Sequence, residues 1–510
     1  MGLVFNCPVV VNAEIVYPTT IYTKIFFCTS IYFCYFVFAL EIGQTKASWL
    51  VFPIIKSLTT ITQKHMRKIS YLLKRTGLTL VSALLLAAPA TAQQTSAAYT
   101  PSAENLKARK EFANRRFGIF LHWGIYSLFA QGEWYLETGK LNGQEYEKVA
   151  NAFYPHDFDA DSWIKTFKDA GAKYICFTTR HHDSFSMWDT KQSDYNIMHT
   201  PYKKDIVKAL ADACHKEGMG LHFYYSHLDW RRPDYPLGRT GHHTGRELKP
   251  NYQTYFNFMN AQLTELLTNY GKVDAIWFDG YWDHDQDSVP FDWRVREQYD
   301  LIHRLQPACL VGNNHHLPPM AGEDIQLFER DVPGENEAGY SGENGVSETL
   351  PLETCQTMNG MWGYKVADQH YKSATTLIRL LARTASKGAN LLMNIGPQPD
   401  GNLPKTAVER LHEMGAWLKA NGEAIYGTDG VNYPQGGDSI VSTRNGQTFY
   451  MHILKNDVTR IDELPAGCKG KEAVVLTTGE KLRIKKVKGK KSIEGISVPK
   501  DCADFVIKVN

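Results

Sequence analysis

The strongest constraint on the fold of this chain is a regular alternation of short apolar runs with stretches of helical spacing. The apolar runs lie at residues 117–123, 174–179, 221–225, 275–278, 310–312, 325–328 and 391–395, with a weaker run near 352–358. Helical spacing occupies residues 160–170, 204–217, 252–270, 292–305 and 373–386. Strands that alternate with helices pair in parallel, because each crossover helix returns the chain to the same end of the sheet. About eight such units predict an α/β fold, a (β/α)8-type barrel over residues 105–430.

The pattern changes after a last helical stretch at residues 404–421. Short β-like runs follow at 439–444, 448–454, 473–476, 481–486 and 505–509, separated by glycine and charged residues rather than by helices. This arrangement predicts a small C-terminal antiparallel β-sandwich over residues 431–510. Its lysine-rich run at 485–491 is interpreted as a solvated hairpin, with binding of an anionic glycan as the alternative.

The N-terminal part contains a pattern typical of protein export. After Met66, basic residues precede an apolar stretch at 78–88 and the small residues Ala90-Thr91-Ala92. Residues 66–92 are therefore predicted to be a signal peptide, followed by a linker at 93–104, and the mature protein is expected to be periplasmic or otherwise exported. A signal peptide acts at a true N-terminus, so residues 1–65 are interpreted as a spurious upstream extension. The alternative is a real N-terminal anchor, because residues 21–40 are apolar.

Composition excludes several classes of protein. The chain has 510 residues, of which 43% are hydrophobic and 22% charged, with a net charge of +2. This balance is typical of a globular protein with a large core, and it carries no footprint of nucleic-acid binding. Six cysteines follow the predicted signal peptide without any metal-binding spacing, and they are expected to be mainly buried thiols.

Polar side chains follow the predicted barrel strands at the same end of each strand. In a parallel barrel these ends meet at one mouth, where such folds place their sites. The residues concerned are His122-Trp123, Arg180-His181-His182-Asp183, Tyr224-Tyr225-Ser226-His227, Asp279, Asn313-Asn314-His315-His316 and Glu329-Arg330-Asp331. Their convergence predicts a single site at the mouth of the barrel.

Two of these residues, Asp279 and Glu329, are carboxylates on nearby strands among histidines and aromatic residues. Paired carboxylates in such a pocket suit the cleavage of glycosidic bonds. The competing interpretation is a metal-dependent hydrolase with ligands from His122, His181, His182, His315 and His316. However, no HxH or HExxH motif is present, and adjacent histidines on a strand point to opposite faces. We therefore expect neither a metal nor a cofactor.

Six segments carry a resemblance to a known family. They are FGIFLHWG at 117–124, GEWY at 132–135, TRHHD at 179–183, WFDG at 277–280, WGY at 362–364 and GANLLMNIGP at 388–397. Together they resemble the α-L-fucosidases of glycoside hydrolase family 29 from about residue 105 to 430. The resemblance implies a retaining exo-α-L-fucosidase with a C-terminal β-sandwich, acting on a fucosylated oligosaccharide or glycoconjugate.

The resemblance also implies roles for individual residues. Asp279 matches the nucleophile of the family. The positions that match its substrate contacts are His122, Glu133, Trp134, His181, His182, Tyr225, Trp277 and Trp362. A non-catalytic fucose-binding protein would keep this pocket but lack a carboxylate, so the presence of Asp279 argues against that alternative.

The general acid/base is best matched by Glu329, with Glu335 and Glu337 as the other candidates. A general acid must be protonated when substrate docks, so we expect burial and the charge of Asp279 to raise the pKa of Glu329. The chain departs from the family after the fifth strand, where Asn313-Asn314-His315-His316 stands in place of the fucose-binding arginine of many members. This departure is interpreted as a preference for α-1,3/1,4-linked fucose.

Overall fold

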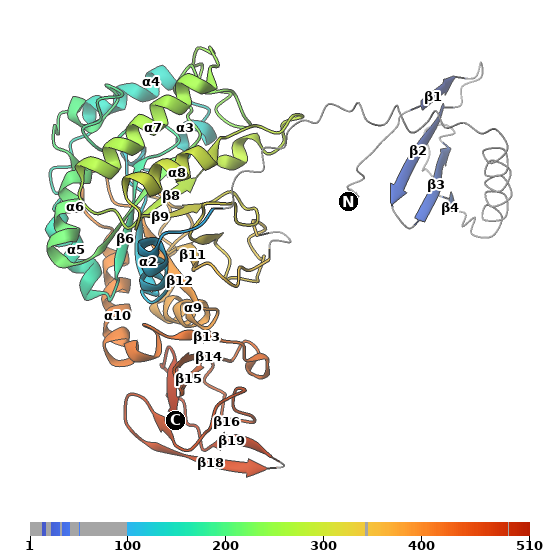
Figure 1. Cartoon of the computed structure of the whole chain (residues 1–510), viewed down its shortest axis with the longest axis vertical. Helices are drawn as coiled ribbons and strands as arrows, with labels where there is room; N and C mark the ends of the chain where they lie inside the picture. Colours follow the sequence, from blue (N-terminus) through green and yellow to red (C-terminus); the bar gives the residue numbers. More distant parts are fainter. Residues whose placement is uncertain are drawn as a thin grey trace. The chain divides into compact units, whose positions relative to one another are not determined.

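The computed structural model describes residues 99–510, except 342–344 and 488, together with four short strands near the N-terminus (Figure 1). These four strands, β1 (Ala13–Val16), β2 (Tyr22–Ser30), β3 (Phe33–Leu40) and β4 (Leu50–Val51), form an antiparallel sheet in that order. The apolar stretch weighed as an anchor thus includes β2 and β3. The predicted signal peptide and most of the predicted linker lie outside the described residues. Within the described part of the chain, no helix is both long and apolar enough to cross a membrane.

Eight parallel strands form the central sheet and confirm the predicted barrel. They are β5 (Phe117–Leu121), β6 (Tyr174–Arg180), β7 (Gly220–Ser226), β8 (Ala275–Asp279), β9 (Leu310–Asn313), β10 (Gln326–Glu329), β11 (Leu352–Thr357) and β12 (Ala389–Ile395). Their order is β10-β11-β12-β5-β6-β7-β8-β9. A bridge between Gly312 and Ile325 joins β9 to the residue that precedes β10, so the barrel is nearly closed.

Helices surround this barrel. They are α2 (Ala103–Ala113), α3 (Tyr135–Thr138), α4 (Gly143–Glu147), α5 (Ala160–Asp169), α6 (Ile206–Glu217), α7 (Tyr252–Asn269), α8 (Val295–Leu305), α9 (Ala374–Ser386) and α10 (Lys405–Asn421). Side chains cap the start of the crossover helices: Asp159, Asp205, Asn251 and Ser373 each accept a backbone N–H of the first turn. Among the described residues, β9 and β10 are followed by loops rather than α-helices.

The barrel strands read as continuous apolar runs because both of their faces are buried. Outward side chains such as Ile276 and Phe278 pack against the helices, whereas inward ones such as Phe120, Tyr224 and Trp277 fill the barrel. The polar end of each strand therefore lies directly above a packed interior. This packing gives the site a rigid floor.

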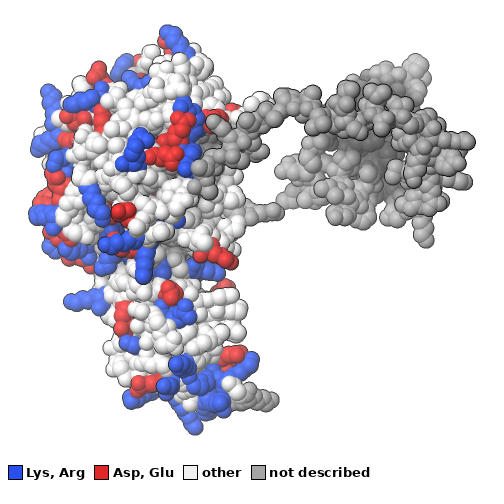
Figure 2. All heavy atoms as spheres, viewed as in Figure 1, with Lys and Arg blue, Asp and Glu red and all other residues white. Residues whose placement is uncertain are grey.

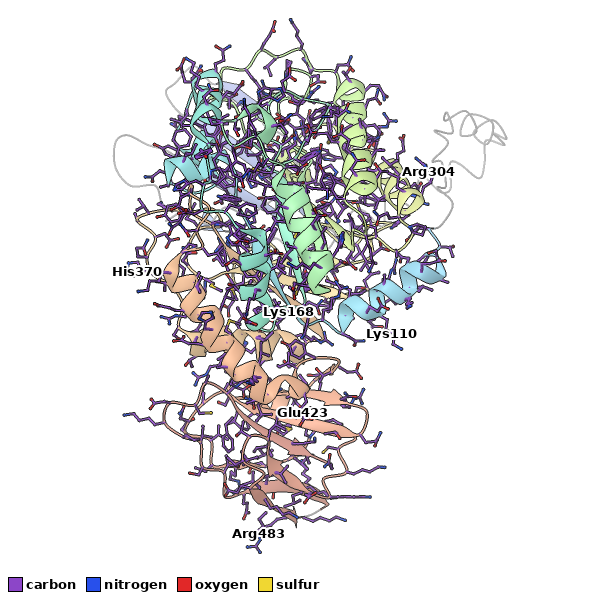
Figure 3. All side chains as sticks on the ribbon, turned by 90° about the vertical axis from the view of Figure 1, so that its left-hand side faces the viewer. Lys110, Lys168, Arg304, His370, Glu423 and Arg483 are labelled. Carbon is purple, nitrogen blue, oxygen red and sulfur yellow. The ribbon has the colours of Figure 1, made fainter. Side chains whose placement is uncertain are left out.

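The C-terminal strands confirm the predicted antiparallel β domain. They are β13 (Asp429–Val431), β14 (Ile440–Asn445), β15 (Thr448–Ile453), β16 (Arg460–Ile461), β17 (Ala473–Val475), β18 (Lys481–Val487), β19 (Lys490–Glu494) and β20 (Phe505–Val509). They form a single eight-stranded sheet in the spatial order β13-β14-β15-β20-β17-β18-β19-β16, with a hydrophobic core separate from that of the barrel. At the junction with the barrel, Lys508 Nζ lies 3.0 Å from Glu423, which is labelled in Figure 3.

The lysine-rich run forms the hairpin of β18 and β19 at the far end of this domain, near Arg483 (Figures 2 and 3). Lys485 pairs with Glu494, and Lys490 Nζ lies 2.7 Å from Glu463. Two of its five lysines are therefore paired with carboxylates of the same domain. None of the described residues of the C-terminal domain lines the pocket discussed below.

Candidate active site

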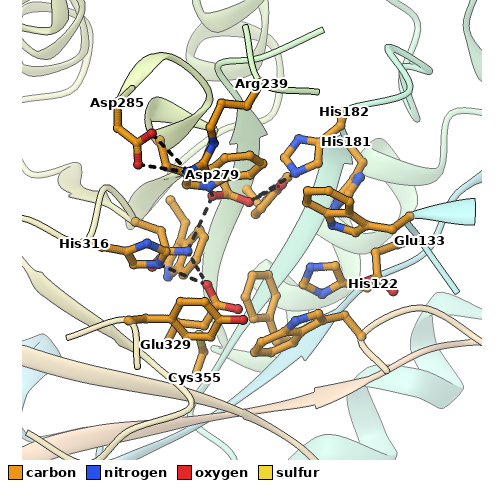
Figure 4. A pocket seen from close by; sticks show the side chains of 18 of the residues that line it. His122, Glu133, His181, His182, Arg239, Asp279, Asp285, His316, Glu329 and Cys355 are labelled. Carbon is orange, nitrogen blue, oxygen red and sulfur yellow. Dashed lines mark hydrogen bonds and ion pairs between the residues drawn. The ribbon is translucent and has the colours of Figure 1, made fainter. Parts of the chain in front are cut away.

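A cavity of about 450 Å³ opens at the C-terminal ends of the barrel strands (Figure 4). Nine of the predicted catalytic and substrate-binding residues line it: His122, Glu133, Trp134, His181, His182, Trp277, Asp279, Glu329 and Trp362. Five barrel strands and the loops above them supply these side chains. The predicted convergence on one mouth is therefore present in the fold.

Asp279 ends β8 and is held by donors on both carboxylate oxygens. Its Oδ1 accepts from the backbone N–H of Gly280 at 2.8 Å and from Trp282 Nε1 at 3.1 Å, and its Oδ2 accepts from the Tyr224 hydroxyl at 2.8 Å. Gly280 has a φ of 87°, and a Cβ there would lie 2.8 Å from the backbone nitrogen of Leu228, so glycine is needed at this turn. Burial and the charge of Glu329 raise the pKa of Asp279.

Glu329 ends β10 on the opposite wall of the pocket. Its Oε2 accepts from Asn314 Nδ2 at 2.8 Å and lies 3.2 Å from His316 Nε2. Burial favours the protonated form, but the hydrogen bonds and charge of His316, with Asn314 and Arg330, outweigh it and hold the pKa of Glu329 below its usual value. The expectation of a raised pKa for Glu329 was therefore wrong, because the donors that surround this carboxylate come from a loop whose position the sequence did not reveal.

Three histidines on the pocket wall are neutral. Burial lowers the pKa of His122 to about 3 and also lowers the pKa values of His181 and His182. His122 Nδ1 donates to Asn394 Oδ1 at 2.7 Å. His182 Nδ1 donates at 2.7 Å to Ser226 Oγ, which itself donates to the Leu228 carbonyl. These bonds leave Nε2 of both rings as acceptors, which suits the hydroxyl groups of a sugar.

Aromatic side chains and Glu133 complete the pocket. The Trp134 ring stacks on Trp282 with centroids 5.5 Å apart, and Trp277 Nε1 donates to the buried Glu353 at 3.0 Å. Glu133 accepts from the backbone N–H of Gly363 at 2.6 Å, and burial raises its pKa. A pocket of aromatic faces and fixed hydrogen-bond partners can hold the C–H surface and the hydroxyls of a sugar at the same time.

Tyr225 is the predicted contact that the structure places elsewhere. Its hydroxyl donates to Gln262 on α7 at 2.7 Å, and the Arg180 guanidinium lies 5.1 Å from its ring centroid, outside the barrel. The pocket residue is its neighbour Tyr224. Alternation along β7 places the two tyrosines on opposite faces, and the pairing of Tyr224 with Trp277, which shares the inward face with Asp279, identifies Tyr224 as the inward one.

We therefore expect Tyr224→Phe and Tyr225→Phe to differ in their effects. Loss of the Tyr224 hydroxyl removes a donor to the Asp279 carboxylate and should lower kcat roughly tenfold or more. Tyr225→Phe should leave kcat within about twofold and lower the free energy of unfolding by about 1 kcal/mol, because its hydroxyl contacts Gln262 and Arg180 outside the barrel and not Asp279. Steady-state kinetics and denaturant unfolding of the two variants test this; equal kinetic effects would contradict the placement.

Several pocket residues were not predicted because they lie on loops. Arg239 and Asp285 form an ion pair at the mouth, with Arg239 Nη1 3.1 Å from Asp285 Oδ1. Tyr340 stacks on His316 with centroids 5.1 Å apart. Loop positions carry no periodicity, so only their place next to a strand end could have pointed to them.

The two other candidates for the general acid/base lie outside this pocket. Glu335 Oε1 lies 2.7 Å from Arg383 Nη2 on α9 and lines a different cavity, and Glu337 is exposed. Among the described residues, no group of three histidine, cysteine, aspartate or glutamate side chains converges in a way that could hold a metal ion. His315, one of the histidines considered as a ligand, pairs with Glu323 at 2.8 Å.

Comparison with known proteins identifies the family of this chain. The family model described as "Alpha-L-fucosidase" matches residues 86–423. The chain belongs to the α-L-fucosidase family, a family of glycoside hydrolases. Tissue α-L-fucosidase of Bos taurus is 30% identical to it over 399 residues, which cover 70% of this chain and 77% of the relative. Plasma α-L-fucosidase of Homo sapiens is 30% identical over 361 residues, or 65% and 72% of the two chains.

Solved structures of this family share the fold. Alpha-L-fucosidase isoenzyme 1 from Paenibacillus thiaminolyticus superposes with a TM-score of 0.71 at 32% identity, covering 80% of this chain and 99% of that one. A family 29 α-L-fucosidase from Bacteroides thetaiotaomicron, trapped as a covalent intermediate with 2-fluoro-fucosyl fluoride in a Glu-to-Gln variant, has a TM-score of 0.69 at 26% identity. That match covers 82% of this chain and 98% of the relative.

Proposed function

We propose that the protein is a retaining exo-acting α-L-fucosidase, which hydrolyses terminal α-L-fucose from glycans, with Asp279 as nucleophile and Glu329 as general acid/base. The observation that carries this proposal is the placement of the two carboxylates across one pocket walled by neutral histidines and tryptophans. His122, Glu133, Trp134, His181, His182, Trp277 and Trp362 are proposed to contact the fucose. Neither a metal-dependent hydrolase nor a non-catalytic binding protein is favoured, because the matched relatives are α-L-fucosidases.

The spacing of the carboxylates supports retention of configuration. Asn314 Nδ2 lies 2.8 Å from Glu329 Oε2 and 3.5 Å from Asp279 Oδ1. Because one nitrogen contacts both, these two oxygens lie at most about 6.3 Å apart, just below the roughly 6.5–9.5 Å between carboxyl groups that an inverting enzyme leaves for its water. Asp279 would attack the anomeric carbon while Glu329 protonates the leaving oxygen, and Glu329 would then deprotonate the water that cleaves the fucosyl-enzyme.

The proton needed in the first step belongs to the carboxylate pair as a whole. Two interacting carboxylates titrate with shared apparent pKa values, and the pair with one proton is the productive form. Burial and the charge of Glu329 raise the pKa of Asp279, and donors around Glu329 lower its pKa, so the ordinary difference in pKa between the two carboxyl groups is reduced or reversed. For attack to occur, Asp279 must be ionised and Glu329 must carry the proton.

The trapped relative from Bacteroides thetaiotaomicron supports the same chemistry. A covalent intermediate requires an enzymic nucleophile, and in that relative it was trapped with 2-fluoro-fucosyl fluoride in a Glu-to-Gln variant. Such trapping is expected when the glutamate provides the base for the second step. It thus favours a glutamate as the general acid/base here, and Glu329 is the glutamate opposite Asp279.

The decisive experiment is release of fucose from a panel of linkage-defined fucosylated oligosaccharides and from an aryl α-L-fucoside. We expect hydrolysis of both, α-fucose as the first anomer in time-resolved NMR, and unchanged rates in EDTA. The panel also tests the proposed preference for α-1,3/1,4 linkages. No release from any substrate would contradict the function, and β-fucose as the first product would contradict retention.

We also propose that the protein is exported after cleavage near residue 92, on the strength of the pattern that follows Met66. N-terminal sequencing of the native exported protein should give a chain that starts at or near Gln93. A native chain that still contains residues 1–65 would contradict both the signal peptide and the upstream extension.

A further inference from the structure

Asn314 occupies a position between the two reacting carboxylates. It directly follows β9, and its Nδ2 faces Glu329 Oε2 at 2.8 Å and Asp279 Oδ1 at 3.5 Å. At least one carboxylate of the pair is ionised and can only accept hydrogen bonds, so the amide nitrogen faces the pair. The orientation of the side chain is therefore determined by its neighbours.

This arrangement has costs in the surrounding structure. Asn314 Oδ1 is buried and finds no hydrogen-bond partner among the described residues. Two residues nearby, His316 and Arg330, have φ values of 61° and 62°, a left-handed conformation that is uncommon for residues other than glycine. Unpaired buried atoms and strained backbone persist where the surrounding structure requires them, and they concentrate at functional sites.

The two strained residues are close in sequence to the partners of the Asn314–Glu329 hydrogen bond: His316 is two residues after Asn314, and Arg330 directly follows Glu329. His316 adds a second contact to Glu329 Oε2 at 3.2 Å, and the Arg330 guanidinium lies 4.8 Å from the centroid of the Trp362 ring. The loop 314–316 and the end of β10 thus hold Glu329 from two sides. Asn314 Nδ2, which contacts Glu329, also contacts Asp279.

We propose that Asn314 is a positioning residue that bridges the nucleophile and the general acid/base, setting their separation and stabilising the pair with a single proton. This inference rests on the proposed function of Asp279 and Glu329. It explains why an amide stands here: a carboxylate would repel both neighbours, and an apolar side chain would leave them without their shared donor.

The bridge should act on the pH dependence of the enzyme. A donor to a carboxylate favours its ionised form, so loss of the donor should raise both apparent pKa values of the pair. The other titratable or charged groups that face the pair are His122, Glu133, His182, Tyr224, His316, Arg330 and Cys355. All of them remain in an Asn314 variant, so a shift reports the bridge itself.

The test compares Asn314→Ala, the isosteric Asn314→Asp and the matched control Asn313→Ala. Asn313 is also a buried asparagine with an unpartnered Oδ1 within the described structure, but its Nδ2 donates to the Tyr299 hydroxyl at 2.8 Å and not to a carboxylate. We expect Asn314→Ala to lower kcat/KM about 10- to 100-fold and to move both limbs of its pH profile upward. Asn314→Asp, which adds a third carboxylate, should move them further, and Asn313→Ala should leave them in place.

A second readout separates this inference from the proposed function. Trp282 Nε1 donates to Asp279, so the pH-dependent part of the tryptophan fluorescence that disappears in Trp282→Phe should report the ionisation of the pair without any turnover. An upward shift of this titration in Asn314→Ala supports the bridge even if no fucoside is cleaved by the wild type. Unshifted pH limbs and an unshifted fluorescence titration in both folded Asn314 variants, or the same shifts in Asn313→Ala, would overturn the inference.

Discussion

Asp279→Ala should lower kcat roughly 10⁴-fold or more on every fucoside, because the variant has no group to form the covalent intermediate. The loss should not depend on the leaving group, since the nucleophile takes part in cleavage of all substrates. The protein should stay folded. Asp279 lies in an open pocket with its side chain 13% exposed, so water can reach the donors that it leaves behind. Removing one of two neighbouring carboxylates also relieves their repulsion.

Steady-state kinetics with an aryl α-L-fucoside, together with thermal unfolding, measure this result. Azide should restore part of the activity by occupying the vacated space and attacking the anomeric carbon. Asp285→Ala is the matched control, because Asp285 is a carboxylate on the loop that follows Asp279, and it pairs with Arg239 at the mouth. It should retain the rate on the aryl substrate within a few-fold. An Asp279→Ala enzyme that kept more than about a tenth of the wild-type rate would place the nucleophile elsewhere.

Glu329→Ala should affect substrates selectively, according to their leaving groups. A natural glycan leaves as an alkoxide that needs a proton, so its kcat/KM should fall about 10²- to 10⁴-fold. An activated aryl fucoside leaves as a stable phenolate, and its kcat/KM should fall far less. The second step should become slow for both, because the water loses its base, so the fucosyl-enzyme should accumulate and give a burst of released phenol.

Glu335→Ala provides the control for this comparison. Glu335 is paired with Arg383 and lines another cavity, so its loss should change neither substrate class by more than about twofold. The measurement is kcat/KM for both substrates in the two variants, with mass spectrometry of the trapped enzyme. If Glu335→Ala alone showed the selective loss, the general acid/base would be Glu335, brought to the pocket by a movement of its loop.

The sequence by itself determined the barrel and placed Asp279 at its mouth, and it offered Glu329 as the first of three candidates for the general acid/base. Strands buried on two faces must be apolar throughout, and crossover helices must be amphipathic, so the alternation from residue 117 to 395 is a direct imprint of the fold. An acid such as Asp279 that ends an apolar strand has no packing role, and its presence there indicates a catalytic role. The motifs around His122, His181 and Trp362 then indicated a sugar pocket, and the structure brings these residues together.

Only the tertiary structure decided which of two adjacent tyrosines faces the pocket. It also decided in which direction the pKa of Glu329 is shifted. Tyr224 and Tyr225 are identical in type and adjacent, and the pairing of Tyr224 with Trp277 in the barrel shows that Tyr224 is the inward one. The direction in which the pKa of Glu329 is shifted depends on its contacts with His316 and Asn314. Both residues lie on the loop after β9, which brings them next to the end of β10. Loops have no periodicity and electrostatic interactions act through space, so neither the contacts at the mouth nor the balance between Asp279 and Glu329 could be predicted from residue order.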